Sequence, residues 1–201
     1  NFISSLKIAV APYAAVHSAS QLADGIAKVG LPAVLKTTTL GYDGKGQVKI
    51  QKGDDANAAW RSLKNAPCIL EGFIHFEREI SVVAARSADG HVECFEAAEN
   101  EHRDHILKVS TVPAKISPAL ATEAKRVATK IAKAFDYVGV LAVEMFVVKG
   151  KGKQAVLVNE IAPRVHNSGH WSIDGATVSQ FEQHIRAVAG WPLAKPMRLG
   201  R

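Results

Sequence analysis

The sequence predicts an α+β fold with antiparallel sheets, and three observations support this. Short segments that alternate apolar and polar residues, such as QVKIQ at 47–51, recur along the chain. Several consecutive segments of this kind are joined by short Gly-containing turns, which is typical of β-hairpins. Longer segments with helical spacing of apolar residues lie between these groups of strands. Helices that separate groups of hairpin-connected strands indicate α+β architecture rather than alternating βαβ units.

Four helices are expected, over residues 18–29, 54–64, 117–136 and 177–189. Ser18 or Ser20 is positioned to cap the first helix, and Gly30 follows its end. Ser117 is the expected cap of the third helix, with Pro118 in its first turn.

Helical spacing also predicts which side chains of the last two helices are buried. For the third helix these are Ala124, Val127, Ile131 and Phe135. For the fourth they are Val178, Phe181, Ile185 and Val188.

Strands are expected between the helices, over residues 33–39, 46–51, 68–74, 79–86, 91–97, 138–148 and 154–162. We expect two lobes, each a sheet with helices packed on it. Residues 1–75 would form a small lobe and residues 76–190 a large one, and residues 191–201 would begin a connection to a further domain.

Composition excludes some classes of function. The 201 residues are 47% hydrophobic and 22% charged, which is ordinary for a globular protein. No apolar run approaches the roughly 20 residues of a membrane span. The net charge of +6 favours anionic ligands, but the basic residues are dispersed, so no nucleic acid partner is expected. Cys68 and Cys94 lack metal-ligand spacing and are interpreted as reduced thiols of a cytoplasmic protein.

A Gly-rich segment lies between the first two expected strands, in LKTTTLGYDGKGQVKI at 35–50. One glycine is enough for a hairpin turn, whereas this segment has Gly41, Gly44 and Gly46. Glycines let backbone N–H groups approach a phosphate, and Lys36 and Lys45 would neutralise its charge. The segment lacks the Walker pattern. A phosphate-binding loop and a plain hairpin both remain open.

Two carboxylates interrupt apolar strands, Glu144 in GVLAVEMFVV and Glu160 in AVLVNEIA. With a turn centred near Gly152, the two residues are equally far from the turn and would face each other across adjoining strands. Two like charges at that separation repel, and a divalent cation between them removes the repulsion. Oxygen ligands next to Asn159 favour Mg²⁺, with Mn²⁺ as an alternative ion. The other interpretation is that each glutamate meets a lysine or arginine.

A second pair of carboxylates, Glu71 and Glu79, flanks a bend in CILEGFIHFEREISVV. An exposed charged turn explains either residue alone. A strand that links two lobes is also a place where an adenine and its ribose could be held. His102 and His105 are three residues apart in an expected strand-and-loop region, so a zinc site is not expected. No motif for acyl-enzyme chemistry is present.

These segments together resemble the ATP-grasp superfamily. Within it, KTTTLGYDGKGQ, EGFIHFEREISVV, VEMF and above all NEIAPRVHNSGHW closely resemble the family of N5-carboxyaminoimidazole ribonucleotide synthases. The resemblance covers essentially the whole chain. The last segment is the most specific, because other ATP-grasp families share its Asn-Glu but not the residues that follow.

The resemblance implies an ATP-dependent carbon–nitrogen ligase of de novo purine biosynthesis. Such an enzyme joins bicarbonate to 5-aminoimidazole ribonucleotide through carboxyphosphate, and releases ADP and phosphate. It also implies a cytoplasmic homodimer and a fragment without the family's N-terminal domain and most of its C-terminal domain, which we expect to be inactive alone. The alternatives are another ATP-grasp carboxylase or amine ligase, and a non-catalytic nucleotide- or RNA-binding module.

The resemblance also assigns roles to individual residues. For ATP they are Lys36, Gly41, Tyr42, Asp43, Gly44, Lys45, Gly46, Gln47, Glu71, Gly72, Phe73, Ile74, Glu79, His102, Asn159 and Glu160. The metal ligands would be Glu144 and Glu160. Bicarbonate and the aminoimidazole would face Tyr42, Asp43, Arg164, His166, Asn167 and Ser168, of which Arg164, His166 and Asn167 would be catalytic.

The chemistry of the implied reaction suits two of these residues. Arg164 is expected to grip a carbonate-like oxygen pair through two parallel hydrogen bonds. His166 is expected to carry a proton, with a pKa near neutrality. His170 and Trp171 belong either to the reaction chamber or to the packing of the loop.

Overall fold

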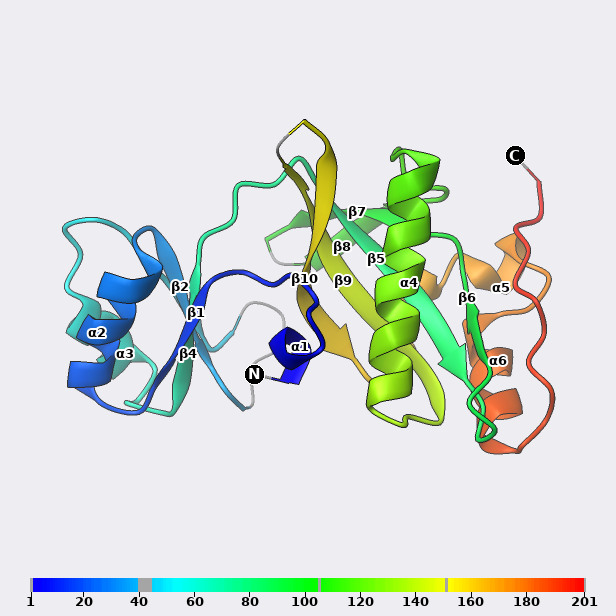
Figure 1. Ribbon diagram of the computed structural model, residues 1–201, viewed down its shortest axis with the longest axis horizontal. Coiled ribbons are helices and arrows are strands. Elements are labelled where there is room, and N and C mark those ends of the chain that lie inside the picture. Colours follow the sequence, from blue (N-terminus) through cyan, green and yellow to red (C-terminus); the bar gives the residue numbers. More distant parts are fainter. Residues whose placement is uncertain (1, 40–44, 105, 151, 201) are drawn as a thin grey trace. The chain divides into compact units, whose positions relative to one another are not determined.

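A computed structural model describes residues 2–39, 45–104, 106–150 and 152–200 (Figure 1). The chain forms two compact units. The smaller unit contains residues 11–75 and 104–106, and the larger unit contains the first ten residues, Phe76–Arg103 and the chain from Leu107 onward. Within the described ranges, no helix is long and apolar enough to cross a membrane.

The smaller unit is a four-stranded antiparallel sheet in the order β1-β4-β2-β3. Its strands are β1 (Tyr13–Val16), β2 (Ala33–Thr37), β3 (Gln47–Ile50) and β4 (Cys68–Gly72). Helices α2 (Ala19–Val29) and α3 (Ala56–Ser62) cover it, and the core between them includes Val16, Leu22, Leu35, Ile50 and Leu70. Ser18 caps α2, as expected, and Asp55 caps α3.

The larger unit is built on a second antiparallel sheet in the order β10-β9-β5-β7-β8, with β6 paired to β5. Its strands are β5 (Arg78–Arg86), β6 (Val92–Cys94), β7 (Ala98–Arg103), β8 (Ile106–Thr111), β9 (Gly139–Lys149) and β10 (Gln154–Ala162). Its helices are α1 (Phe2–Ser5), α4 (Pro118–Ala134), α5 (Ser172–Gly175) and α6 (Gln180–Val188), and Asn167–Gly169 form a single 3₁₀ turn, η1.

Each face of the larger sheet has its own core. On one face α4 lies across the strands (Figure 1), and its Val127 and Ile131 pack with Ile80, Leu141 and Val143. On the other face, near α6, Val83, Phe95, Val140 and Ala142 pack together. Successive residues of β9 therefore alternate between two buried layers, which explains its almost continuous apolar sequence.

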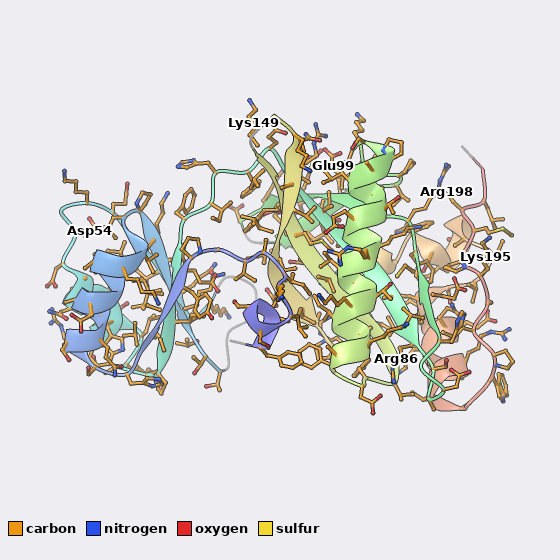
Figure 2. The ribbon with its side chains drawn as sticks, viewed as in Figure 1. Asp54, Arg86, Glu99, Lys149, Lys195 and Arg198 are labelled. Atoms are coloured by element: carbon orange, nitrogen blue, oxygen red, sulfur yellow. The ribbon has the colours of Figure 1, made fainter. Side chains whose placement is uncertain are left out.

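The edge strand β10 and the last described residues are both tied to this unit. The N–H group of Val158 donates to the carbonyl of Ala9 at 2.9 Å, and Val10 and Val158 form a parallel bridge. The first ten residues belong to the larger unit for this reason. Arg198, which is labelled in Figure 2, donates to Glu96 at 2.8 Å and so links the last described residues to the segment before β7.

The α+β architecture with antiparallel sheets is confirmed, and so are the expected helices and strands, with shifts at their ends. Ser117 caps α4, and Pro118 occupies its first turn. Three strands were not expected: β1, β7 and β8. Phe135 follows the end of α4, is 48% exposed and contacts Phe2, so its predicted place in the buried stripe is wrong.

The predicted buried face of the last helix is also wrong. Phe181, Ile185 and Val188 are exposed, and the buried side chains of α6 are Gln180, Gln183 and Ala187. Of the four residues expected inside, only Val178 is buried, and it precedes the helix. The buried glutamines are tolerated because each hydrogen bonds to backbone groups, Gln180 to His166 and Gln183 to Ala194.

Candidate functional site

The two carboxylates expected to meet do face each other. Glu160 of β10 is directly opposite Glu144 of β9 in the antiparallel ladder. On the other side of β9, Glu144 is opposite Ser81 of β5. Directly opposed residues share a face of the sheet. Ser81, Glu144 and Glu160 therefore form one row across three strands.

A β-bulge at Asn159 produces this opposition. From Gln154 to Val158 the ladder keeps one register, which would place Asn159 opposite Glu144, but the register shifts by one residue between Val158 and Glu160. Asn159 is the extra residue, so Asn159 and Glu160 both oppose Glu144. Without the shift, strict alternation would turn Glu160 toward the α4 face. The predicted pairing is thus correct, although the hairpin turn alone does not create it.

The electrostatics of this row are unfavourable for the free protein. Burial raises the pKa of the Glu144 carboxyl, and the negative charge of Glu160 raises it further. His102 and Arg164 act in the opposite direction and lower the pKa of Glu144, but they do not cancel the effect. Glu144 loses hydration beside the exposed acid Glu160, and this makes the site attractive for a cation.

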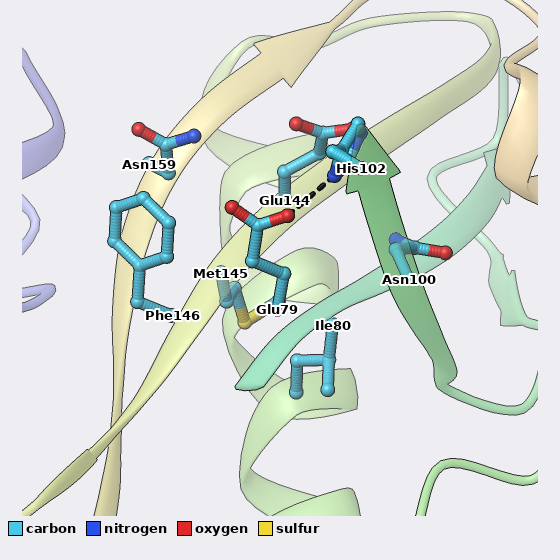
Figure 3. A pocket seen from close by; sticks show the side chains of 8 residues that line it. All are labelled: Glu79, Ile80, Asn100, His102, Glu144, Met145, Phe146 and Asn159. Carbon is cyan, nitrogen blue, oxygen red and sulfur yellow. Dashed lines mark hydrogen bonds and ion pairs between the residues drawn. The ribbon is translucent and has the colours of Figure 1, made fainter. Parts of the chain in front are cut away.

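A small pocket lies next to the row, lined by Glu79, Ile80, Asn100, His102, Glu144, Met145, Phe146 and Asn159 (Figure 3). Asn100, Glu79 and Phe146 are opposed across β7, β5 and β9, so they share one face. Nδ1 of His102 contacts a carboxylate oxygen of Glu79. Four of the residues predicted to bind ATP or metal therefore gather around one pocket: Glu79, His102, Glu144 and Asn159.

The loop after β10 brings His166 to the same row. Nε2 of His166 lies 3.3 Å from Oε1 of Glu144. Burial lowers the pKa of His166 to about 4, and the nearby charges of Arg164, His102 and His170 lower it as well. The expectation of a pKa near neutrality is wrong, because it did not include the loss of hydration. His166 is a neutral ring in this structure.

The other residues of this loop have different surroundings. Arg164 is exposed and donates to the carbonyl of Val165 at 3.0 Å. Asn167 is exposed at the start of η1, whereas Ser168 is buried. The ring of His170 stacks on Phe181 with centroids 5.9 Å apart, and Trp171 meets Phe95 edge-on. These contacts support the packing interpretation for His170 and Trp171.

The remaining predicted ATP residues belong to the smaller unit. Nζ of Lys36 lies 2.6 Å from Oε2 of Glu71, and both side chains are partly exposed. Strands β2 and β3 form a hairpin in which Lys36 is opposite Gln47, and Thr37 N–H donates to Gly46 O. Gly46 has a positive φ of 76°, which glycine tolerates.

Some of the residues predicted to bind ATP lie in or beside the part of the chain that the structure does not describe. Gly41, Tyr42, Asp43 and Gly44 lie outside the described residues, and so does His105. Lys45 is exposed at the end of the loop. Beyond Glu71, Gly72 N–H donates to Pro12 O and Phe73 N–H to Pro32 O, and Ile74 is partly buried.

Three buried polar residues near His166 were not predicted: Ser81, Asn100 and Gln180. Ser81 interrupts an apolar strand as Glu144 does, so the same criterion applied to neutral residues would have found it. Asn100 lies on a strand that was not expected. Gln180 receives the N–H of His166 and donates to its carbonyl, at 2.9 and 2.7 Å, and only the folded loop reveals this.

The donor set around Glu144 fits Mg²⁺ only in part. Two carboxylates and one amide oxygen are oxygen ligands of the preferred kind. Across the described residues, no group of three or more His, Cys, Asp or Glu side chains is arranged to hold a metal ion. Mg²⁺ commonly binds through one or two carboxylates and completes its shell with phosphates and water. The residues present fit an ion that arrives with a phosphate ligand.

The fold and this arrangement of acids define an ATP-grasp protein. Residues 1–181 match the model of the ATP-grasp domain, and the chain belongs to that family. Among curated proteins, it is 49% identical over 199 residues to the N5-carboxyaminoimidazole ribonucleotide synthase of Brucella melitensis. That match covers 98% of this chain and 54% of the relative.

Solved structures give the same result. An N5-carboxyaminoimidazole ribonucleotide synthetase in complex with ADP superposes with a TM-score of 0.92 and 43% identity, over 99% of this chain and 52% of that one. The Aspergillus clavatus enzyme, solved with ADP and 5-aminoimidazole ribonucleotide, has a TM-score of 0.86 and 30% identity, over 96% and 50%. The chain spans about half the length of these relatives.

Proposed function

We propose that this chain carries the ATP site of an N5-carboxyaminoimidazole ribonucleotide synthase of de novo purine biosynthesis. The reaction converts ATP, bicarbonate and 5-aminoimidazole ribonucleotide to N5-carboxyaminoimidazole ribonucleotide, ADP and phosphate, through carboxyphosphate. The observation that carries the proposal is the row in which Glu144 faces Asn159 and Glu160, next to His166. The similarity to enzymes of this name supports the choice of substrates.

Glu144, Glu160 and Asn159 would hold Mg²⁺, or Mn²⁺, together with the nucleotide's phosphates. When bound, the ion would neutralise charge on the phosphates during transfer of the γ-phosphoryl group. The bulge places both Asn159 and Glu160 opposite Glu144, so these side chains would bind the ion without a rearrangement of the strand. The repulsion between the two acids would be relieved only when the nucleotide and its ion arrive.

The nucleotide would be held by the remaining predicted residues. Glu79 and His102 form a pair at the pocket, in which the carboxylate would accept a ribose hydroxyl and the imidazole would approach phosphate. Lys36 would exchange its partner Glu71 for a phosphate oxygen. The proposed phosphate loop is 41–47, and the adenine edge would meet the backbone of 71–74.

The reacting end would lie beyond Glu160. Arg164 is exposed, and its guanidinium would hold the paired oxygens of bicarbonate. His166, with its low pKa, would serve as a neutral hydrogen-bond donor rather than as a carrier of protons at neutral pH. Asn167 would orient the aminoimidazole, with Tyr42 and Asp43 of the loop, whereas the buried Ser168 would act through its hydrogen bond to His166. Exclusion of water would protect carboxyphosphate from hydrolysis.

The test is phosphate release by the protein expressed from its complete gene. We expect release only when ATP, bicarbonate and 5-aminoimidazole ribonucleotide are all present. Glu160→Gln should reduce kcat by at least about 100-fold, because a lost ligand weakens electrostatic stabilisation of the transferred group. Glu123→Gln is the matched control, since Glu123 lies on α4 and pairs with Arg126 there. Release that ignores both bicarbonate and the amine would reject the proposal.

Two alternatives are separated by the same assay. Another amine in place of aminoimidazole ribonucleotide would support release if the chain belongs to a different ATP-grasp ligase. A nucleotide- or RNA-binding module would bind with steep salt dependence and would be unaffected by Glu160→Gln.

We also propose that the protein acts in the cytoplasm as a homodimer. Its two unpaired thiols, Cys68 and Cys94, support a reducing compartment. The family resemblance supports the dimer, and sedimentation of the complete gene product measures it.

A further inference from the structure

A chain of buried polar side chains leads to the inner face of His166. The amide of Asn100 donates to Oγ of Ser81 at 3.0 Å, and Ser81 donates to Oγ of Ser168 at 2.7 Å. Oγ of Ser168 lies 2.8 Å from Nδ1 of His166. Ser81 and Ser168 are each 1% exposed and Asn100 is 6% exposed, so water does not replace these bonds.

The direction of these hydrogen bonds follows from the donors at the far end. An amide NH₂ group only donates, so Ser81 accepts from Asn100 and its own hydrogen is directed to Ser168. The amide oxygen of Asn100 in turn accepts from Ser110 at 2.9 Å. Ser168 accepts from Ser81, so its own hydroxyl hydrogen is available to donate. The next polar atom in this series of hydrogen bonds is Nδ1 of His166.

A second contact gives the same direction independently. The backbone N–H of Ser168 points at Nδ1 of His166, 3.3 Å away. A backbone N–H can only donate, so Nδ1 carries no hydrogen. This excludes the imidazolium, in which both nitrogens are protonated. The single ring hydrogen is on Nε2, which lies 3.3 Å from Oε1 of Glu144.

We propose that Asn100 and Ser81 are positioning residues, which act through Ser168 to hold His166 in the tautomer with hydrogen on Nε2, the ring nitrogen that lies 3.3 Å from Glu144. In this state the nitrogen nearest to Glu144 carries the hydrogen and cannot accept a proton on the side that faces the row. The tautomer stands on geometry alone, whereas its effect on turnover rests on the proposed function.

The direct test is long-range ¹H–¹⁵N correlation NMR on the complete protein labelled with ¹⁵N-histidine. Protonated and unprotonated ring nitrogens resonate well apart, and His166→Gln identifies the His166 signals by their loss. We expect a protonated Nε2 and an unprotonated Nδ1. In Ser81→Ala, which removes only the hydroxyl, the His166 signals should shift toward the average of two exchanging tautomers. Ser62→Ala, which removes an exposed hydroxyl of α3, should leave them unchanged.

A second variant protects the test against misfolding of Ser81→Ala. Ser110→Ala removes the partner that holds the Asn100 amide in its orientation, at a half-buried position. It should cause the same kind of shift to a smaller extent. The proposal is overturned if the wild-type ring is protonated on Nδ1, or if a folded Ser81→Ala protein keeps the wild-type signals.

Kinetics separate this proposal from the proposed function. Ser81→Ala should lower kcat about 10-fold with little change in KM for ATP, as expected for loss of a group that orients a ligating side chain. Ser81→Thr retains the hydroxyl and should recover part of kcat. If the complete protein lacks the ligase activity but shows the expected tautomer, the proposed function fails and the positioning proposal stands. If the complete protein is fully active but His166 has the opposite tautomer, the positioning proposal fails and the proposed function stands.

Discussion

Glu144 has surroundings unlike those of an ordinary surface carboxylate. It lies in a nearly buried strand, faces a second acid and has a raised pKa. A lone acid in an apolar run was enough to single out both Glu144 and Glu160 from the sequence. The low pKa of His166 could not be predicted in this way, because desolvation depends on which groups pack around the ring.

At this scale we predict opposite effects of two Glu→Gln substitutions on stability. A carboxyl with a raised native pKa binds its proton more tightly when folded, so the native state loses stability as pH rises above the ordinary value of 4.5. Glu144→Gln should therefore raise Tm at pH 7.5 without metal or nucleotide, and the gain should disappear near pH 4.

Glu123 provides the contrast, because hydrogen bonding to Arg126 lowers its pKa. Its contribution is present above 4.5 and is lost as pH falls through its native pKa, so Glu123→Gln should lower Tm slightly at pH 7.5. Calorimetry at both pH values measures the two effects. A lower Tm for Glu144→Gln at pH 7.5 would show that the acid stabilises the fold.

Among the elements, helices with caps were the most predictable. Ser18 and Ser117 accept hydrogen bonds from the first turns of α2 and α4, as their sequence positions indicate. Strand β7, AENEHR, lacks an alternating apolar pattern because Asn100 and His102 face the pocket. Strand β8 is mostly exposed, so burial leaves no pattern in it. Strands of this kind form because of tertiary contacts, which the sequence pattern does not show.

Helix α6 shows how a strong apolar pattern can mislead, and it supports the second prediction. Gln180→Ala would leave the buried N–H and C=O of His166 without partners, and should cost about 1–3 kcal/mol or more. Ile185→Gln replaces a side chain that is 55% exposed, and should change stability by no more than about 0.5 kcal/mol. Urea unfolding of both variants tests this. A larger loss of stability for Ile185→Gln than for Gln180→Ala would support the buried face predicted from the sequence.

The third prediction concerns the bulge in β10. Deleting Asn159 returns the later residues to regular alternation, so Ile161 would still face α4 and Glu160 would still oppose Glu144. The deletion variant should therefore fold with a Tm close to that of the wild type. Binding of ADP with Mg²⁺, measured by calorimetry, should be weakened about 10-fold or more by loss of an oxygen ligand and its geometry.

Asn159→Ala is the control for the deletion, because it keeps the extra residue and removes only the amide. A deletion variant that binds as tightly as the wild type would show that the bulge has no role in the site. A deletion variant that fails to fold would show that the bulge is needed for the ladder itself.

For the whole molecule, sequence patterns predicted the α+β architecture but not which distant segments join. The first ten residues belong with the larger unit because Val10 pairs with Val158, far along the chain. No periodicity in a ten-residue segment carries that information. Asp104 and Ile106 likewise group with the smaller unit, although Ile106 begins β8 of the larger sheet.

The fourth prediction follows from the separate cores of the two units. Leu70 is fully buried in the core of the smaller unit. Leu70→Ala should destabilise that unit by about 2–5 kcal/mol through the cavity it leaves. Hydrogen exchange should then become faster in β2 and β4, while the amides of β9 keep their protection. Equal acceleration in β9 would show that the two units unfold as one.

The bulged ladder also determines what heat would damage first. Glu144 and Glu160 are spaced by the main-chain bonds of β9 and β10, and β9 lies inside its sheet, between β5 and β10. Their spacing is therefore kept for as long as the sheet stays folded. On warming, the surface loops unfold before the sheet does. Thermal inactivation would therefore begin while Glu144 and Glu160 still face each other, and activity should return on brief cooling.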